Sequence, residues 1–476
     1  PSGLGVLYFL GCTFPVILMW NDKMFYDSRF ASEDDTYHRT LEILILGSVA
    51  TAVLHIRPVN YMADGENSIA MFGFCLGLTL ASILHQLRYL ELFLWVDGGP
   101  EAKQSGLRDA IGRSSSTVWF VAAMIASALA YYGSSDSHDD DHRILAGDSD
   151  TVFRQTINST DLPILLCLIG SFSQMIYMFV MILFCFPNDG SHKKNTVPMN
   201  IDFVIHRTGE WTMLMLGESI LSLLIVDIER GINYSLTFYS GIISAILLQY
   251  MHFRSQPHHA DGHAMRQSRE SGVAFSFLMQ VYSASLIAVG GSYKMLLYEF
   301  TYEGEYDSGD GKRLLTPSYG PPLGRSLAGG PPSGFSEEDR QQRVANIFCI
   351  SLALVWFSSD LMTISHKGIS SNWDRCHCDK DSQFSKIGAF VIFLRICLLV
   401  FIATLSQYVS DPTPIAIIGL VGNMAQVILR EMSTAIFPNG NVHDTNDGEK
   451  HSEESDEDDD KWPNTTQART AHIIGN

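Results

Sequence analysis

Ionisable side chains inside long apolar stretches are the residues of this sequence most able to do chemistry. The clearest is Glu218, which lies within the apolar stretch Trp211 to Ile228. Because a charged group is costly at membrane depth, such a carboxyl marks a path for ions or protons, or else it ties helices together as a buried structural group. Three further ionisable residues precede it on the same predicted helix: His206, Arg207 and Glu210.

Helical spacing relates these four residues to one another. His206 and Glu210 are one turn apart, and Arg207 lies within roughly 20° of the Glu218 face but roughly 16 Å along the axis. The sequence therefore predicts that Glu218 lies inside the membrane, with His206 and Arg207 at its cytoplasmic mouth.

A second group of charges is spaced by three along the stretch Ser68 to Val96. His85, Arg88 and Glu91 would form a slowly drifting stripe on one side of a helix. Arg88 could pair with Glu91 or reach Glu218 on another helix. Since the stretch is longer than a membrane span, part of the stripe could instead simply emerge at the cytoplasmic interface.

A third candidate is Arg395, which has only apolar neighbours between Phe393 and Cys397. A guanidinium in such a stretch needs an anion. The expected protein partner is Glu218 or Asp360, and the alternative is an anionic substrate.

Two loop segments carry histidine and carboxylate side chains at short spacing. One runs from Asp136 to His142, and the other combines His252 with His258, His259, Asp261 and His263. Either could hold a divalent metal loosely, but a solvated polar loop is the simpler interpretation, so no metal site is predicted. The sequence has no nucleophile elbow, phosphate-binding glycine loop or zincin helix, which favours a protein that is not an enzyme and needs no cofactor.

The elements that must position these residues are predicted membrane spans. Of the 476 residues, 46% are hydrophobic and 17% are charged, and the two kinds are segregated into apolar blocks of about twenty residues and polar loops. This predicts an all-α, polytopic bundle with about eleven spans: Leu4 to Trp20, Leu41 to Ile56, Ser68 to Val96, Thr117 to Tyr132, Leu162 to Phe186, Trp211 to Ile228, Tyr234 to Phe253, Gly272 to Tyr298, Val344 to His366, Lys386 to Val409 and Pro414 to Phe437.

The charge of the loops predicts the orientation of the chain. Lys and Arg are concentrated in the loops after the odd-numbered spans, and basic loops stay in the cytosol. The acidic C-terminal tail is then cytosolic, and which membrane holds the protein is left open. Asn158, in the sequon Asn158-Ser159-Thr160, falls on the outer side and is a candidate glycosylation site, although short sequons also arise by chance.

Composition divides the chain into four segments. Residues 1–300 hold helices one to eight, 301–343 form a flexible Gly/Pro-rich loop, 344–437 hold helices nine to eleven, and 438–476 form a disordered acidic tail. The net charge of −19 excludes nucleic acid as a partner. The expected partners are the lipid bilayer and a small ion or solute, and assembly into a homo-oligomer is left open.

One pattern resembles a known family. Arg207-Thr-Gly209 followed by Leu216-Gly217-Glu218-Ser219-Ile220 is similar to the low-temperature-requirement A family, whose members read Glu-Arg-Phe-Gly and then Leu-Gly-Glu-Ser. His206 and Thr208 stand where that pattern has Glu and Phe. The resemblance extends to residues of other spans and loops: Trp20, Tyr26, Arg29, Phe30, Asp34, Asp35, Arg39, Arg88 and Arg395.

The family's opening span, with its Glu-Leu-Phe-Phe-Asp signature, has no counterpart here, so the chain would begin at the second family span. The resemblance implies the fold and the residues to examine, and it implies no settled activity.

Three functions remain as hypotheses. The first is a transporter or channel for a small ion or solute, with Glu218 as binding carboxylate and Arg88 or Arg395 as its partner. The second is a membrane scaffold or signalling protein whose buried charges are structural. The third is a divalent-metal transporter that collects ions on the His/Asp loops.

Overall fold

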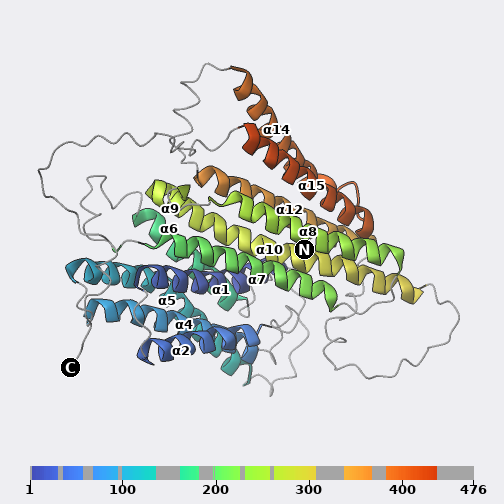
Figure 1. Cartoon of the computed structure of the whole chain (residues 1–476). Helices are drawn as coiled ribbons and strands as arrows, with labels where there is room; N and C mark the ends of the chain where they lie inside the picture. The colour runs from blue at the N-terminus through green and yellow to red at the C-terminus, as the bar shows by residue number, and fades with distance from the viewer. Residues whose placement is uncertain are drawn as a thin grey trace, which may run out of the picture.

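The computed structural model describes residues 3–30, 36–56, 68–94, 99–135, 161–181, 197, 199–225, 231–257, 262–306, 337–366 and 382–436. Within these ranges the regular structure is almost entirely α-helix, as predicted (Figure 1). The long helices are α1 (Gly3–Phe30), α2 (Thr36–Leu54), α4 (Ser68–Leu94), α5 (Gly99–Ser135), α6 (Leu162–Val180), α7 (Ile201–Leu224), α8 (Ile232–Ser255), α10 (Arg269–Tyr306), α12 (Glu337–His366), α14 (Ser382–Leu405) and α15 (Pro412–Ile436), and α9 (Ala264–Gln267) is a single turn.

Each predicted span coincides with one long helix, but several helices continue well beyond their apolar block. α1 runs ten residues past Trp20, and α5 begins eighteen residues before Thr117. Among the described helices, eight are long and apolar enough to cross a membrane, and α2, α7 and α14 are not among them. The fold class is confirmed, whereas the number of spans stays a prediction.

The outer surface of the bundle is apolar. Large hydrophobic side chains are exposed all along the helices, including Ile43, Leu129, Leu214, Ile232 and Phe393. Such a surface is unfavourable in water and suits hydrocarbon, and helices satisfy their own backbone hydrogen bonds there. The helices and this surface together indicate a multi-pass membrane protein.

The helices pack into two halves that meet along α1. In the first half, α2, α4, α5 and α6 pack around Tyr8 and Met19 of α1. In the second half, helices α7 to α15 form a larger cluster that includes Phe14 and Ile17 of α1. Figure 1 shows the first half in blue and teal and the second in green to red. The boundary between the halves, along α1, α7 and α10, is called the seam.

Several predicted segments lie partly or wholly outside the described residues. α10 and α12 take in residues 301–306 and 337–343 of the segment predicted as a flexible loop, and residues 307–336 are not described. The tail after residue 436, the sequon at Asn158 and the segment Asp136 to His142 also lie outside the described ranges.

Candidate functional site

A buried ion pair joins α1 to α5 in the first half. Arg113 donates through Nη1 to Asp22 Oδ2, and the two residues are 6% and 4% exposed. Gln174 of α6 donates to the other oxygen of Asp22 at 2.9 Å. The Arg113 guanidinium lies 4.6 Å from the ring centroid of Tyr89 on α4. Four helices thus contribute to one charged network, and its hydrogen bonds offset the cost of burying two charges.

A second polar cluster lies one turn further along α1. Asp27 accepts from Lys23 at 2.6 Å and from Arg88 at 3.5 Å. Arg88 is 4% exposed, and its guanidinium lies 3.9 Å from the ring centroid of Tyr26. His85 is fully buried, and neither of its ring nitrogens has a hydrogen-bond partner among the described residues. The predicted stripe on α4 is therefore buried at His85 and Arg88.

A cavity of about 280 Å³, here called the charged cavity, opens beside the Asp22–Arg113 pair. It lies in the seam, because its walls come from α1, α4, α5 and α6 of the first half and from α9, the first turns of α10 and the residue Met199 before α7 of the second. Its lining residues are Asp22, Phe25, Arg29, Tyr89, Arg108, Asp109, Gly112, Arg113, Gln174, Tyr177, Met178, Met181, Met199, Met265, Ser268, Gly272, Val273 and Ser276.

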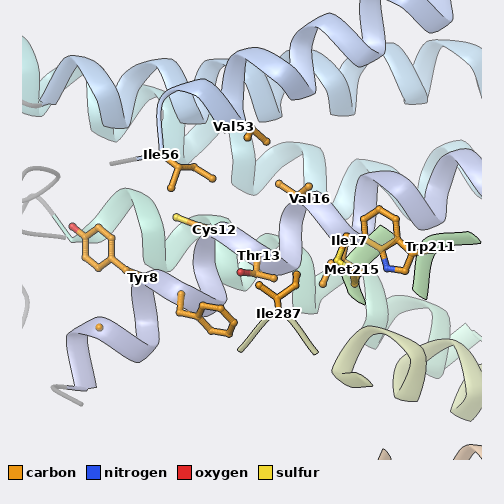
Figure 2. A pocket seen from close by; sticks show the side chains of 12 residues that line it. Tyr8, Cys12, Thr13, Val16, Ile17, Val53, Ile56, Trp211, Met215 and Ile287 are labelled. Atoms are coloured by element: carbon orange, nitrogen blue, oxygen red, sulfur yellow. The ribbon is translucent and has the colours of Figure 1, made fainter. Parts of the chain in front are cut away.

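A second cavity, here called the apolar cavity, has a volume of about 470 Å³ and lies further toward the start of α1. Its lining residues are Gly5, Tyr8, Phe9, Cys12, Thr13, Val16, Ile17, Val53, Ile56, Trp211, Met215 and Ile287. Figure 2 shows these side chains gathered along α1, with Val53 and Ile56 on one side and Trp211 and Met215 at one end. This cavity also draws on both halves of the bundle.

A contact between three helices lies near the level of α1 where one cavity ends and the other begins. Trp20 of α1 stacks on Trp211 of α7, with ring centroids 4.4 Å apart and planes 25° apart. Trp211 Nε1 also donates to Ser283 Oγ of α10 at 3.0 Å. Along α1, residues 5–17 include the lining of the apolar cavity and residues 22–29 that of the charged cavity, so Trp20 falls between the two sets along the helix and lines neither. Trp20, Trp211 and Ser283 are called the tryptophan plug.

Glu218 does not form the predicted pair with Arg88 or Arg395. The structure pairs those arginines with Asp27 and Asp360. Glu218 is exposed on α7, and it has no hydrogen-bond or ion-pair partner among the described residues. The predicted pairing is wrong because the helix buries the face that carries Thr208, Thr212, Leu216 and Leu223, and Glu218 lies outside it.

The other candidates on α7 and α4 form contacts between neighbouring charges. Glu210 accepts from Arg207 at 2.8 Å, and its other oxygen lies 3.1 Å from His206 Nε2. All three side chains are exposed near the start of α7. Glu91 lies 3.8 Å from His38 Nε2 of α2. The structure therefore does not bring these residues together with Glu218.

Arg395 belongs to a charge cluster of the second half. Its guanidinium donates to Asp360 Oδ1, which confirms Asp360 as its partner and excludes Glu218. Arg430 of α15, which the sequence analysis missed, donates to the same oxygen at 3.0 Å and to Ser359 Oγ at 3.0 Å. Gln426 accepts from Arg395 Nε at 3.2 Å. One carboxylate thus serves two arginines from different helices.

Two histidines from the predicted metal-collecting loop are buried instead of solvated. His252 and His263 are both 0% exposed, and the His263 ring centroid lies 4.7 Å from that of His366 at the end of α12. His258, His259 and Asp261 lie outside the described residues. Within the described part of the chain, no group of three His, Cys, Asp or Glu side chains is arranged to hold a metal.

Burial of His263 predicts a pH-dependent stability. Desolvation lowers the pKa of His263 to about 4, and the ring packs against Phe275 and His366. The unfolded chain therefore takes up a proton on this residue near pH 6.5, while the folded chain does so only near pH 4. The contribution of His263 to the free energy of unfolding is therefore complete above pH 6.5. It is lost as the pH falls from 6.5 to 4, and the loss is about 3 kcal/mol at most.

We expect the melting temperature of the purified protein to fall less steeply between pH 6.5 and 4 when His263 is replaced by Gln. His206→Gln, at an exposed histidine, serves as the matched control. An unchanged slope in His263→Gln would contradict this account.

The fold and the charged seam together define an all-helical, multi-pass membrane protein. Residues 1–420 match the family described as bacterial low temperature requirement A protein (LtrA), and the chain belongs to this family, as the sequence resemblance predicted. No curated protein and no solved structure gives a significant match to the chain. The matched residues include both cavities and the pairs Asp22–Arg113 and Asp360–Arg395, and they end before Arg430.

Proposed function

We propose that this protein carries a small solute across the membrane by opening the seam alternately at its two ends. The observation that supports this proposal is that two cavities, each lined by both halves, lie at different levels of α1, with the tryptophan plug at the level between them. Transporters commonly bind their substrate between two halves and rock one half against the other. Here each cavity would be the access path on one side.

The orientation follows from the loop charges. They favour a start of α1 outside the cytosol, in which case the apolar cavity would open outward and the charged cavity would open to the cytosol. α1 would be the fixed axis of the motion, because it packs against both halves. The motion would break the contacts of Trp211 with Trp20 and leave the first-half network around Asp22 intact.

The binding carboxylate of this proposal is Asp22 in place of Glu218. Asp22 lines the charged cavity and is already neutralised by Arg113, so a charged solute could compete for either group without exposing a bare charge to hydrocarbon. Glu218 has no such partner among the described residues.

Cysteine labelling from each side tests whether the two cavities are coupled. In a background without reactive cysteines, Thr13→Cys reports on the apolar cavity and Ser276→Cys on the charged cavity. A bulky impermeant maleimide on Ser276→Cys should hold the charged cavity open. We then expect labelling of Thr13→Cys from the opposite side to slow by about tenfold, within the usual range of coupling between sites.

The control is Asn233→Cys, an exposed position at the start of α8, whose labelling rate should not respond. Independent labelling of the two cavities would indicate a rigid scaffold and overturn the proposal. Reaction of both cysteines with reagent added from one side would indicate an open channel, which would also overturn alternating access. If the chain is inserted the other way round, the same result appears with the two sides exchanged.

A further inference from the structure

The charge cluster of the second half carries more positive than negative charge. Arg395 and Arg430 both donate to one carboxylate, that of Asp360. Their remaining partners are uncharged: Gln426, Ser359 and the carbonyl oxygen of Met251. When the neighbouring ion pair Arg254–Glu431 is also counted, three cations face two anions. One positive charge is therefore in excess among the described residues of this cluster, at a position where an unbalanced charge is costly.

Buried hydrogen-bonding groups beside this charge have no partner among the described residues. They are the Nε of Arg430, the hydroxyl of Tyr282 and both ring nitrogens of His252. The three residues belong to α15, α10 and α8, and they are 4%, 1% and 0% exposed. Buried polar groups are nearly always hydrogen-bonded, because leaving them unpaired is costly. A bound ion or molecule that accepts from these groups would explain them.

Arg430, Tyr282 and His252 are neighbours in space. The rings of His252 and Tyr282 stack with centroids 5.3 Å apart and planes 22° apart. Arg430 Nη1 donates to the carbonyl oxygen of Met251, the residue before His252. Arg430 is also close enough to both rings for its charge to act on them. Unpaired groups from three helices therefore converge beside the excess positive charge.

We propose that Arg430, Tyr282 and His252 bind a small inorganic monoanion such as chloride. One such anion would neutralise the excess charge and accept from Arg430 Nε, from the Tyr282 hydroxyl and from one ring nitrogen of His252. Water could accept from the same donors, but it would leave the charge unbalanced, and a metal cation would add to it. The near-complete burial of all three side chains favours a small anion over an organic one.

The bound anion would join α8, α10 and α15 to one another. None of the three residues lines the apolar cavity or the charged cavity, so this assignment does not rest on the proposed transport function.

Thermal unfolding of the purified full-length protein in a neutral detergent tests the proposal. Sodium chloride replaces sodium gluconate at constant ionic strength, so that screening does not change. We expect the melting temperature to be constant at low chloride and to rise with the logarithm of the concentration above the dissociation constant, because the anion binds only the folded chain. The concentration at which the rise begins is called the chloride threshold.

Tyr282→Phe keeps the ring that stacks on His252 and removes the hydroxyl. The chloride threshold should rise about tenfold, as loss of one hydrogen bond to a charged ligand commonly weakens binding. In gluconate alone, Tyr282→Phe should melt at or above the temperature of the wild type, because an unpaired buried hydroxyl has been removed. In high chloride, Tyr282→Phe should melt below the wild type, so the order of the two proteins reverses between the salts.

Tyr293→Phe is the matched control on the same helix. Tyr293 is 2% exposed, and its hydroxyl already donates to Ser244 Oγ at 2.8 Å. This variant should melt below the wild type in both salts and keep the wild-type chloride threshold.

Arg395→Gln is the second test variant and replaces Tyr282→Phe if that protein does not fold. It removes the excess charge and leaves Asp360 paired with Arg430. Its chloride threshold should therefore also rise by about tenfold or more.

A wild-type melting temperature that is the same in chloride and gluconate would overturn the assignment. Equal chloride thresholds in the wild type, Tyr282→Phe and Arg395→Gln would also overturn it, because the response to chloride would then arise elsewhere. A melting temperature of Tyr282→Phe that is lower than that of the wild type by the same amount in both salts would count against it as well, since water would then satisfy the hydroxyl.

Discussion

Replacement of Asp22 by Asn should lower the free energy of unfolding by about 3–5 kcal/mol, among the largest effects expected for any single substitution in this chain. The reason is that Arg113 would keep its charge in a buried position while losing the one ion-pair partner it has among the described residues, and its side chain is 7% exposed. Gln174 would also lose the carboxylate oxygen to which it donates at 2.9 Å. Chemical unfolding of the purified protein in detergent micelles measures this loss.

A double substitution separates the cost of an orphaned charge from the value of the pair. Asp22→Leu with Arg113→Met removes both charges and should recover most of the stability lost in Asp22→Asn, since apolar replacement of a whole buried pair is often close to neutral. Glu218→Gln, the same kind of change at an exposed position, should stay within about 0.5 kcal/mol of wild type. The explanation fails if the double variant is as unstable as the single one.

Asp360→Asn is expected to be at least as destabilising, because it leaves two arginines without their shared anion. Arg430 is 4% exposed and donates to Asp360 Oδ1 at 3.0 Å, and Arg395 donates to the same oxygen. Loss of the carboxylate would leave like charges from α14 and α15 facing each other, with a cost of about 3–5 kcal/mol or more. The same unfolding measurement applies.

Replacing each arginine of this cluster should lower the free energy of unfolding by a different amount. Arg395→Gln removes one of two cations and leaves Asp360 paired with Arg430, so its cost should be clearly smaller than that of Asp360→Asn. Arg430→Gln should fall between them, because Arg430 also donates to Ser359 and to the carbonyl oxygen of Met251. Equal costs for Arg395→Gln and Asp360→Asn would show that the shared carboxylate is not the centre of the cluster.

Apolar periodicity was sufficient to predict the helices but not their ends. The predicted first span stops at Trp20 because charged residues follow it, and the fourth begins at Thr117 for the same reason. The structure continues both helices through those residues and pairs Asp22 with Arg113. A charge that is neutralised by another helix is compatible with burial, and one sequence does not reveal which distant residues will meet.

The error at Glu218 has a related cause. Its position inside an apolar stretch indicated membrane depth, and depth alone does not determine which side of a helix faces the bundle. The buried face of α7 carries Thr208, Thr212, Leu216 and Leu223, of which two are polar, so hydrophobicity did not identify it. For Arg395 the sequence limited the protein partner to Glu218 or Asp360, because an isolated guanidinium among apolar residues needs an acid at similar depth, and the structure selects Asp360.

The stacked indoles of the plug give the wild-type protein a spectroscopic signal that depends on the distance between the two sides of the seam. Two of its seven tryptophans, Trp20 and Trp211, lie close enough for their excited states to couple, with ring centroids 4.4 Å apart. Such coupling produces a paired positive and negative band in far-ultraviolet circular dichroism, and the bands vanish once the rings separate by more than a few ring diameters. Any ligand that separates the two halves would therefore remove these bands from the circular dichroism spectrum of the unlabelled protein.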